Sequence, residues 1–161
     1  MKKVLIPGSF DPATAGHVDL ARRAALIFDE VHVVAMVNAE KSSGMFTAEE
    51  RLAILESATR EIKNVKCAVC CGLASDYTKE NGIEFIAKGV RNATDFDYEY
   101  SLSEIMKHFH KGIETVFIPA NPTLSYMSST YARERIRHGC DLSDIADEKT
   151  AELIKALWSK K

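Results

Sequence analysis

The chain has 161 residues, a length that suits one domain with a hydrophobic core of useful size. Hydrophobic residues make up 46% and charged residues 27%, which is ordinary for a globular protein. The formal net charge of −2 argues against a nucleic-acid coat or a membrane-surface binder, because both usually carry a basic excess. The apolar run after Lys3 stops at Pro7, which is too short for a signal peptide, and we therefore expect a cytoplasmic protein.

Short apolar strands alternate with helices along the chain. The predicted strands are residues 4–6, 31–37, 65–71, 83–87 and 115–118. The predicted helices are residues 18–28, 48–62, 73–80, 96–111, 129–137 and 143–158. The expected helix starts include a capping box of Thr47 with Glu50, a cap at Asp95, and a cap at Ser128 or Ser129. This alternation predicts a single domain of class α/β: a Rossmann-like, doubly wound sheet of five parallel strands.

Parallel sheets bind ligands at the carboxyl ends of their strands, so the loops after strands one, two, four and five should converge. These loops are residues 8–17, 38–44, 88–95 and 119–130. They concentrate cations and hydroxyls in a slightly acidic chain, which favours an anionic, polyphosphate ligand. The side chains in question are Ser9, His17, Lys41, Lys88, Arg91, Ser125, Ser128, Ser129 and Thr130, with Arg133 one turn later as a second-rank candidate that could instead pair with Glu134 or Glu99.

The first of these loops joins a buried strand to a helix and delivers His17 to the first turn of that helix. A helix N-terminus offers unpaired N–H groups and a partial positive charge, so it suits phosphate. Neither the P-loop signature nor the Gly-x-Gly-x-x-Gly signature occurs in the chain. Their absence weighs against a P-loop ATPase and an ordinary dinucleotide-binding dehydrogenase.

Two patterns could suggest metal sites, but both have a simpler interpretation. Cys67 and Cys70 have the spacing of half a zinc site, yet in a strand they face opposite sides and there is no second pair of this kind. His108 and His110 diverge by about 200° on a helix. We therefore expect structural, reduced cysteines, solvated histidines and no protein metal site.

Six blocks of sequence resemble the bacterial phosphopantetheine adenylyltransferase family, within the nucleotidyltransferase superfamily that carries a T/HxGH motif. The blocks are residues 7–12 (PGSFDP), 14–17 (TAGH), 45–51 (MFTAEER), 89–91 (GVR), 95–99 (DFDYE) and 126–130 (YMSST). Their order and spacing match the family over nearly the whole chain, whereas TxGH alone would be a weak signal.

The resemblance implies adenylyl transfer, in which the phosphate of 4′-phosphopantetheine attacks the α-phosphorus of ATP to give dephospho-CoA and pyrophosphate. It implies that His17 stabilises the transition state, with Mg²⁺ as cofactor. The implied acceptor-binding residues are Ser9, Lys41, Ala74 and Lys88. The implied ATP-binding residues are Ser9, Phe10, His17, Gly89, Val90, Arg91, Glu99, Leu124, Ser125, Tyr126, Met127, Ser128, Ser129 and Thr130. A homohexamer and feedback by CoA are further implications.

The reaction also makes chemical sense from the residues alone, because a phosphate monoester is mostly a dianion near neutral pH and needs alignment and positive charge rather than a general base. The chain departs from the family at Lys88, where arginine is usual, at Ala15, where asparagine is common, and at Leu124, where an aromatic residue is frequent. Two alternatives follow. One is a related transferase acting on nicotinate mononucleotide or a phosphorylated alcohol, and the other is a nucleotide-binding regulator without turnover.

Overall fold

The computed structural model describes residues 1–37 and 44–161. Its strands are β1 (Lys3–Gly8), β2 (Glu30–Met36), β3 (Val65–Cys70), β4 (Phe85–Val90) and β5 (Glu114–Pro119). Its helices are α1 (Ala15–Ala25), α2 (Ala48–Thr59), α3 (Ala74–Asn81), α4 (Ala93–Phe109), the 3₁₀ turn η1 (Pro122–Leu124), α5 (Ser129–Arg137) and α6 (Glu148–Trp158). All strands pair in parallel in the order β3-β2-β1-β4-β5. This confirms the predicted Rossmann-like, doubly wound sheet.

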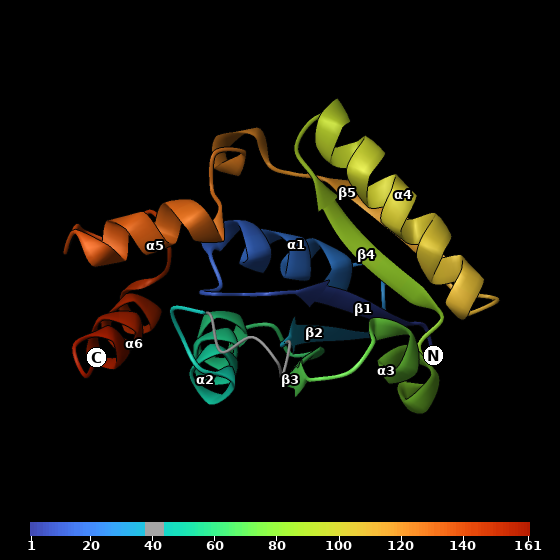
Figure 1. Ribbon diagram of the computed structural model, residues 1–161, viewed down its shortest axis with the longest axis horizontal. Coiled ribbons are helices and arrows are strands. Elements are labelled where there is room, and N and C mark those ends of the chain that lie inside the picture. Colours follow the sequence, from blue (N-terminus) through green and yellow to red (C-terminus); the bar gives the residue numbers. More distant parts are fainter. Residues whose placement is uncertain (38–43) are drawn as a thin grey trace.

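Helices cover both faces of the sheet, and the alternation of side chains along β1 explains why (Figure 1). Val4 and Ile6 face the larger core, which contains residues of α1, α2, α5 and α6. Leu5, between them, faces a smaller core beside residues of α3 and α4. Because β1 lies at the centre of the sheet and is buried on both faces, its sequence is continuously apolar rather than alternating.

The strands and helices exist where the sequence predicts them, but several ends differ. The helix predicted from residue 18 begins at Ala15, because Thr14 caps it. Strand β4 continues through Val90, because Lys88 and Gly89 pair with β5 instead of entering a loop. The capping box of Thr47 with Glu50 is confirmed.

Three helix caps refine the prediction further. The predicted cap at Asp95 is wrong: the side chain of Asn92 accepts the N–H of Asp95 at 2.9 Å and starts α4 three residues earlier. Of the two serines offered as the cap of α5, Ser128 is the cap and accepts the N–H of Tyr131 at 3.1 Å. The last helix starts at Glu148 rather than at residue 143, because Asp147 caps it.

The two doubtful metal patterns have structural contacts. Cys67 lies 3.2 Å from the Thr59 hydroxyl, and the His110 Nδ1 lies 2.9 Å from the Thr78 hydroxyl. In the described ranges no three of the His, Cys, Asp and Glu side chains gather as a metal site would require. Those ranges also contain no helix long and apolar enough to cross a membrane.

A cluster of charges joins the amino ends of β1, β2 and β3. Glu30 accepts from Lys66 at 2.7 Å and lies 2.7 Å from His32 Nε2, while Lys3 is 3.8 Å away. The other nitrogen of His32 lies 2.9 Å from the Tyr77 hydroxyl, which ties β2 to α3. The hydrogen bonds from Lys66 and His32 lower the pKa of Glu30 from 4.5 to about 2.

We expect Glu30→Gln to lower the Tm at neutral pH by a few degrees, equivalent to about 1–2 kcal/mol, since charged hydrogen bonds are lost and Lys66 is largely exposed. The folded pKa lies below the unfolded one, so this stabilisation is present above pH 4.5 and is lost as the pH falls toward 2. Thermal unfolding of both proteins from pH 7 to pH 2.5 should show the difference shrinking. Glu152→Gln, at an exposed position on α6, is the matched control, and a pH-independent difference would contradict the assignment.

Candidate active site

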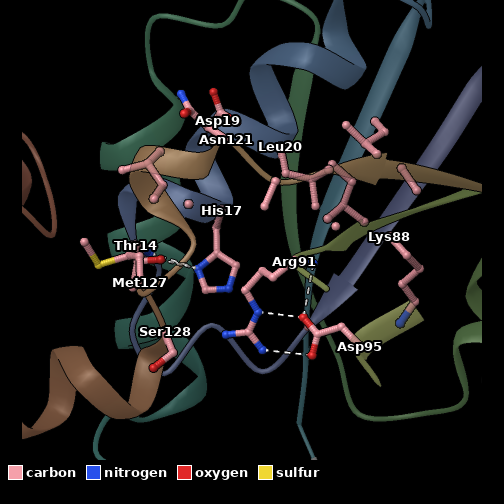
Figure 2. Close-up of a pocket in the computed structure, with 18 of the residues that line it drawn as sticks. Thr14, His17, Asp19, Leu20, Lys88, Arg91, Asp95, Asn121, Met127 and Ser128 are labelled. Carbon is pink, nitrogen blue, oxygen red and sulfur yellow. Dashed lines mark hydrogen bonds and ion pairs between the residues drawn. The ribbon is translucent and has the colours of Figure 1, made fainter. Parts of the chain in front are cut away.

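A cavity of about 330 Å³ opens at the carboxyl ends of β1, β4 and β5. The loops after these three strands converge on it, as the sequence predicts for a parallel sheet. Its lining includes eleven of the predicted residues: Ser9, Phe10, His17, Lys88, Gly89, Arg91, Glu99, Leu124, Met127, Ser128 and Ser129. Figure 2 shows His17 beside the pair formed by Arg91 and Asp95, with Ser128 on the same side as Thr14.

His17 is held as a neutral hydrogen-bond donor. The backbone N–H of Thr14 donates to Nδ1 of His17 at 3.0 Å, so Nδ1 must carry a lone pair and the ring proton sits on Nε2. Burial, and secondarily the charge of Arg91, lower the pKa of His17 from 6.5 to about 4. The ring of Phe10 packs edge-on against the imidazole, with centroids 4.9 Å apart. At neutral pH the site therefore presents a fixed Nε2–H at the amino end of α1.

Two cations from the end of β4 face the cavity, and each is paired with a carboxylate of α4. Arg91 donates through Nε at 2.6 Å and through Nη2 at 3.1 Å to Asp95. Lys88 lies 2.9 Å from Glu99. The hydrogen bond from Arg91 lowers the pKa of Asp95, so this pair stays ionised. Among the described residues the third guanidinium nitrogen, Nη1 of Arg91, has no protein acceptor and remains available to a ligand.

A second cavity of about 340 Å³ adjoins the first. It is mostly apolar and is lined by residues of α3 and α4, including Leu73, Ala74, Leu102 and Met106. Pro7 and Lys88 line both cavities, so Lys88 lies where the two cavities meet. Ala74 thus lies in the neighbouring cavity and does not line the first one.

The remaining predicted residues lie outside the first cavity or outside the described part. Four predicted residues are not in its lining, although each is next in sequence to a residue that is: Val90, Ser125, Tyr126 and Thr130. Thr130 has another contact, because its hydroxyl accepts from Arg133 at 2.9 Å. Lys41 lies outside the described residues.

Comparisons with known proteins identify the family of the chain. The cytidylyltransferase-like family model matches residues 5–135. A phosphopantetheine adenylyltransferase of Corynebacterium diphtheriae is 42% identical over 154 residues, which cover 96% of each chain. The chain belongs to the phosphopantetheine adenylyltransferase family.

Further relatives support the same assignment. A phosphopantetheine adenylyltransferase of Thermobifida fusca is 39% identical over 160 residues, covering 99% of this chain and 96% of the relative. A crystal structure of a Vibrio parahaemolyticus protein described as a nicotinate-nucleotide adenylyltransferase superposes with a TM-score of 0.66. It covers 96% of this chain and 99% of its own, at 17% identity, and therefore shows a shared fold only.

Several residues of the site escaped the sequence analysis. Thr14 sets the tautomer of His17, Asp95 pairs with Arg91, and Asp19, Leu20, Arg23 and Asn121 line the cavity beside them. The signal for Thr14 was available in the family motif TxGH, whose first residue is the N-cap of α1 and whose histidine is at the third helical position. For Asp19 and Arg23, two exposed-looking helix residues at i and i+4, the sequence carried no distinguishing signal.

The described side chains do not make a dedicated magnesium cage. The three carboxylates of the cavity are already paired: Asp95 with Arg91, Glu99 with Lys88, and Asp19 with Arg23 at 3.7 Å. Mg²⁺ usually keeps several waters and binds through substrate phosphates plus one or two carboxylates. The donor set of this site thus fits an ion that would enter as part of a nucleotide complex, and no residue of the protein is required to hold it alone.

We expect the imidazole of His17 to titrate at about pH 4 and to stay neutral from pH 5 to pH 8. Replacing Arg91 by methionine removes the secondary cause, so the pKa of His17 should rise but remain below 6.5, because burial is the larger cause. NMR titration of the histidine ring carbons measures both values. A wild-type pKa near 6.5, or no change on Arg91→Met, would contradict the described environment.

Proposed function

We propose that this protein transfers the adenylyl group of ATP to 4′-phosphopantetheine, giving dephospho-CoA and pyrophosphate, a step of CoA biosynthesis. The observation that carries the proposal is the position of Lys88 at the junction of two cavities. One cavity is lined by charged and hydroxyl groups as well as apolar ones, and the other is mostly apolar and is lined in part by α4. An acceptor with a phosphate at one end and a long uncharged arm at the other fits this pairing.

In the proposed reaction the ATP phosphates lie in the first cavity, which is lined by Ser9, Phe10 and Ser128 near the helix N-termini. The Nε2–H of His17 donates to an oxygen on the α-phosphorus, where negative charge grows as the acceptor phosphate attacks. Arg91 contributes its free Nη1. A neutral donor is effective here, because it is fixed before the reaction and needs no reorganisation. The acceptor needs no base, since its phosphate is already mostly ionised.

The acceptor phosphate is proposed to lie between Ser9 and Lys88, with Lys41 as a further cation from the second loop. Lys88 supplies a compact charge where the family usually has a guanidinium fork. The arm would extend past Ala74 into the apolar cavity, over Leu73, Leu102 and Met106. Mg²⁺ would arrive with ATP and neutralise part of its phosphate charge.

Assembly, regulation and location remain part of the proposal. Exposed aromatic and aliphatic residues line α4, including Phe96, Tyr98, Tyr100, Ile105 and Phe109. Such a patch supports the proposed homohexamer, because large exposed apolar surfaces commonly mark interfaces. We also propose that CoA binds as a feedback ligand, since it shares the phosphopantetheine arm of the acceptor, and that the enzyme acts in the cytoplasm.

The proposal is tested by incubating the protein with ATP, Mg²⁺ and one acceptor at a time while pyrophosphate release is followed. Release with 4′-phosphopantetheine is expected, and release with pantetheine, which lacks the phosphate, is not. Release with nicotinate mononucleotide alone would instead support the related transferase. ATP binding without release for any acceptor would support a regulator without turnover.

We expect Lys88→Gln to raise the KM for 4′-phosphopantetheine about 10-fold or more, since a charge-assisted contact to a phosphate contributes about 1.5–3 kcal/mol. The KM for ATP should change less, because Arg91 and His17 remain. Steady-state kinetics with each substrate varied in turn separates the two effects. Lys79→Gln, at an exposed position on α3, is the matched control. A larger effect on the KM for ATP would instead assign Lys88 to nucleotide binding.

A further inference from the structure

The turn after β1 has its carbonyl groups held by three side chains from distant parts of the chain. Nη1 of Arg51 donates to the carbonyl of Ser9 at 3.2 Å. Nη1 of Arg133 donates to the carbonyl of Asp11 at 2.9 Å, and the hydroxyl of Ser129 donates to the carbonyl of Pro12 at 2.9 Å. All three carbonyls are therefore satisfied by donors of α2 and α5.

Holding a carbonyl also fixes the N–H on the other side of the same peptide plane. In a trans peptide the C=O and the following N–H point in opposite directions. The Ser9 carbonyl points to Arg51 on α2, so the N–H of Phe10 points away from α2. This N–H has no acceptor among the described residues, and Ser9 and Phe10 both line the first cavity. The peptide between them thus offers a donor to an anion in that cavity.

The conformation at this point would not persist without support. Phe10 has φ of +44°, a region that costs a non-glycine residue about 1–3 kcal/mol. Its ring is buried against His17, over Gly8, where an added Cβ would lie 2.9 Å from the ring. Packing alone can hold the ring of Phe10, but the direction of the Ser9–Phe10 peptide depends on which donor the Ser9 carbonyl contacts.

Arg51 is itself fixed from several sides. Its side chain is about nine-tenths buried, and Nε donates to the carbonyl of Phe46 at 2.9 Å and lies 3.4 Å from Asp11. Asp11 in turn accepts the N–H groups of Met45 and Phe46 at 2.9 and 2.8 Å. A Cβ on Gly44 would lie 1.7 Å from Nη2 of Arg51, so only glycine leaves room for the guanidinium.

We propose that Arg51 is a positioning residue: through the Ser9 carbonyl it turns the Phe10 N–H toward the phosphates of the nucleotide. The sequence block of residues 45–51 thereby has a role, because it supplies both Arg51 and the backbone N–H groups that hold its counterion, Asp11. The identity of the anion as ATP or pyrophosphate rests on the proposed function, whereas the orientation of the amide does not.

The test uses inorganic pyrophosphate as the probe and Arg51→Lys as the variant. Lysine keeps a positive charge near Asp11 but has a compact ammonium that cannot donate to Phe46 and Ser9 together as the guanidinium does. We expect the Kd for pyrophosphate to rise about 10- to 100-fold, the usual range for a lost hydrogen bond to a charged group, with the binding stoichiometry unchanged. Arg60→Lys, at the exposed end of α2, should leave the Kd unchanged.

A second readout separates positioning from a general structural role. In protein labelled with ¹⁵N-phenylalanine, pyrophosphate should shift the Phe10 amide proton downfield in wild type and in Arg60→Lys, but not in Arg51→Lys. A lower stoichiometry with unchanged Kd would mean that part of the protein is merely misfolded, and would overturn the proposal. An unchanged Kd with the Phe10 shift retained would also overturn it.

If Arg51→Lys does not fold, Gly44→Ala displaces the same guanidinium without changing any charge and is judged by the same criteria. Failure of wild type to bind pyrophosphate would overturn the inference, because the amide would have no anion to meet. Wild type that binds pyrophosphate in the expected manner, yet releases none with any acceptor, would refute the proposed reaction and leave the role of Arg51 intact.

Discussion

The buried carboxylate of Asp11 is the constraint on which the site depends. It accepts two backbone N–H groups from the segment before α2, and two arginines stand beside it, Arg51 at 3.4 Å and Arg133 at 4.0 Å. Removing a carboxylate from water is costly unless hydrogen bonds and counter-charges replace the lost hydration, and here both are supplied. Because these partners come from α5 and from the segment that starts α2, one buried charge fixes the first turn relative to two elements that are remote in sequence. This junction therefore holds in place the turn that carries Ser9 and Phe10, two residues of the first cavity.

The sequence predicts the architecture well, since strand-length apolar runs alternate with helical periodicity and nothing in the tertiary structure overrides them. The errors occur at the ends of helices and strands, where a single hydrogen bond decides which residue begins or ends the element. Asn92 and Asp95 are both good caps, and the sequence could not show that Asn92 takes the N–H because Asp95 is occupied by Arg91. Gly89 suggests a loop, yet pairing with β5 extends strand β4 through it. These choices depend on partners that are brought near only by folding.

The residues of the site show the same division between what the sequence predicts and what depends on contacts formed by folding. His17, Lys88 and Arg91 can be found from sequence because they follow strands whose ends must meet at one edge of a parallel sheet. Arg133 was expected to pair with Glu134 or Glu99 if it was not a ligand, but it binds the carbonyl of Asp11 and the hydroxyl of Thr130. That mistake is instructive, because charge pairing along a helix is a local rule, whereas the acceptor that Arg133 meets lies 122 positions away. Supporting contacts of this kind leave no periodic pattern in the sequence. The sequence therefore predicts the residues that line the cavity better than the residues that hold those in place.

The pairing of cations in the cavity explains how a chain of net negative charge could bind the proposed polyphosphate ligand. Asp95 and Glu99 lie one turn apart on α4 and pair with Arg91 and Lys88, so their charges are nearly balanced and both cations are held by protein partners. Asp95 accepts from two nitrogens of Arg91 and leaves Nη1 without an acceptor among the described residues, so that the proposed nucleotide would add a contact without breaking the pair. Lys88 has a single ammonium that Glu99 already contacts, so the proposed acceptor phosphate would have to share that charge or displace the carboxylate. In the proposed reaction the nucleotide half of the site is thus preorganised, while the acceptor half depends on an exchange of partners at Lys88, the position where this chain departs from the family's usual arginine.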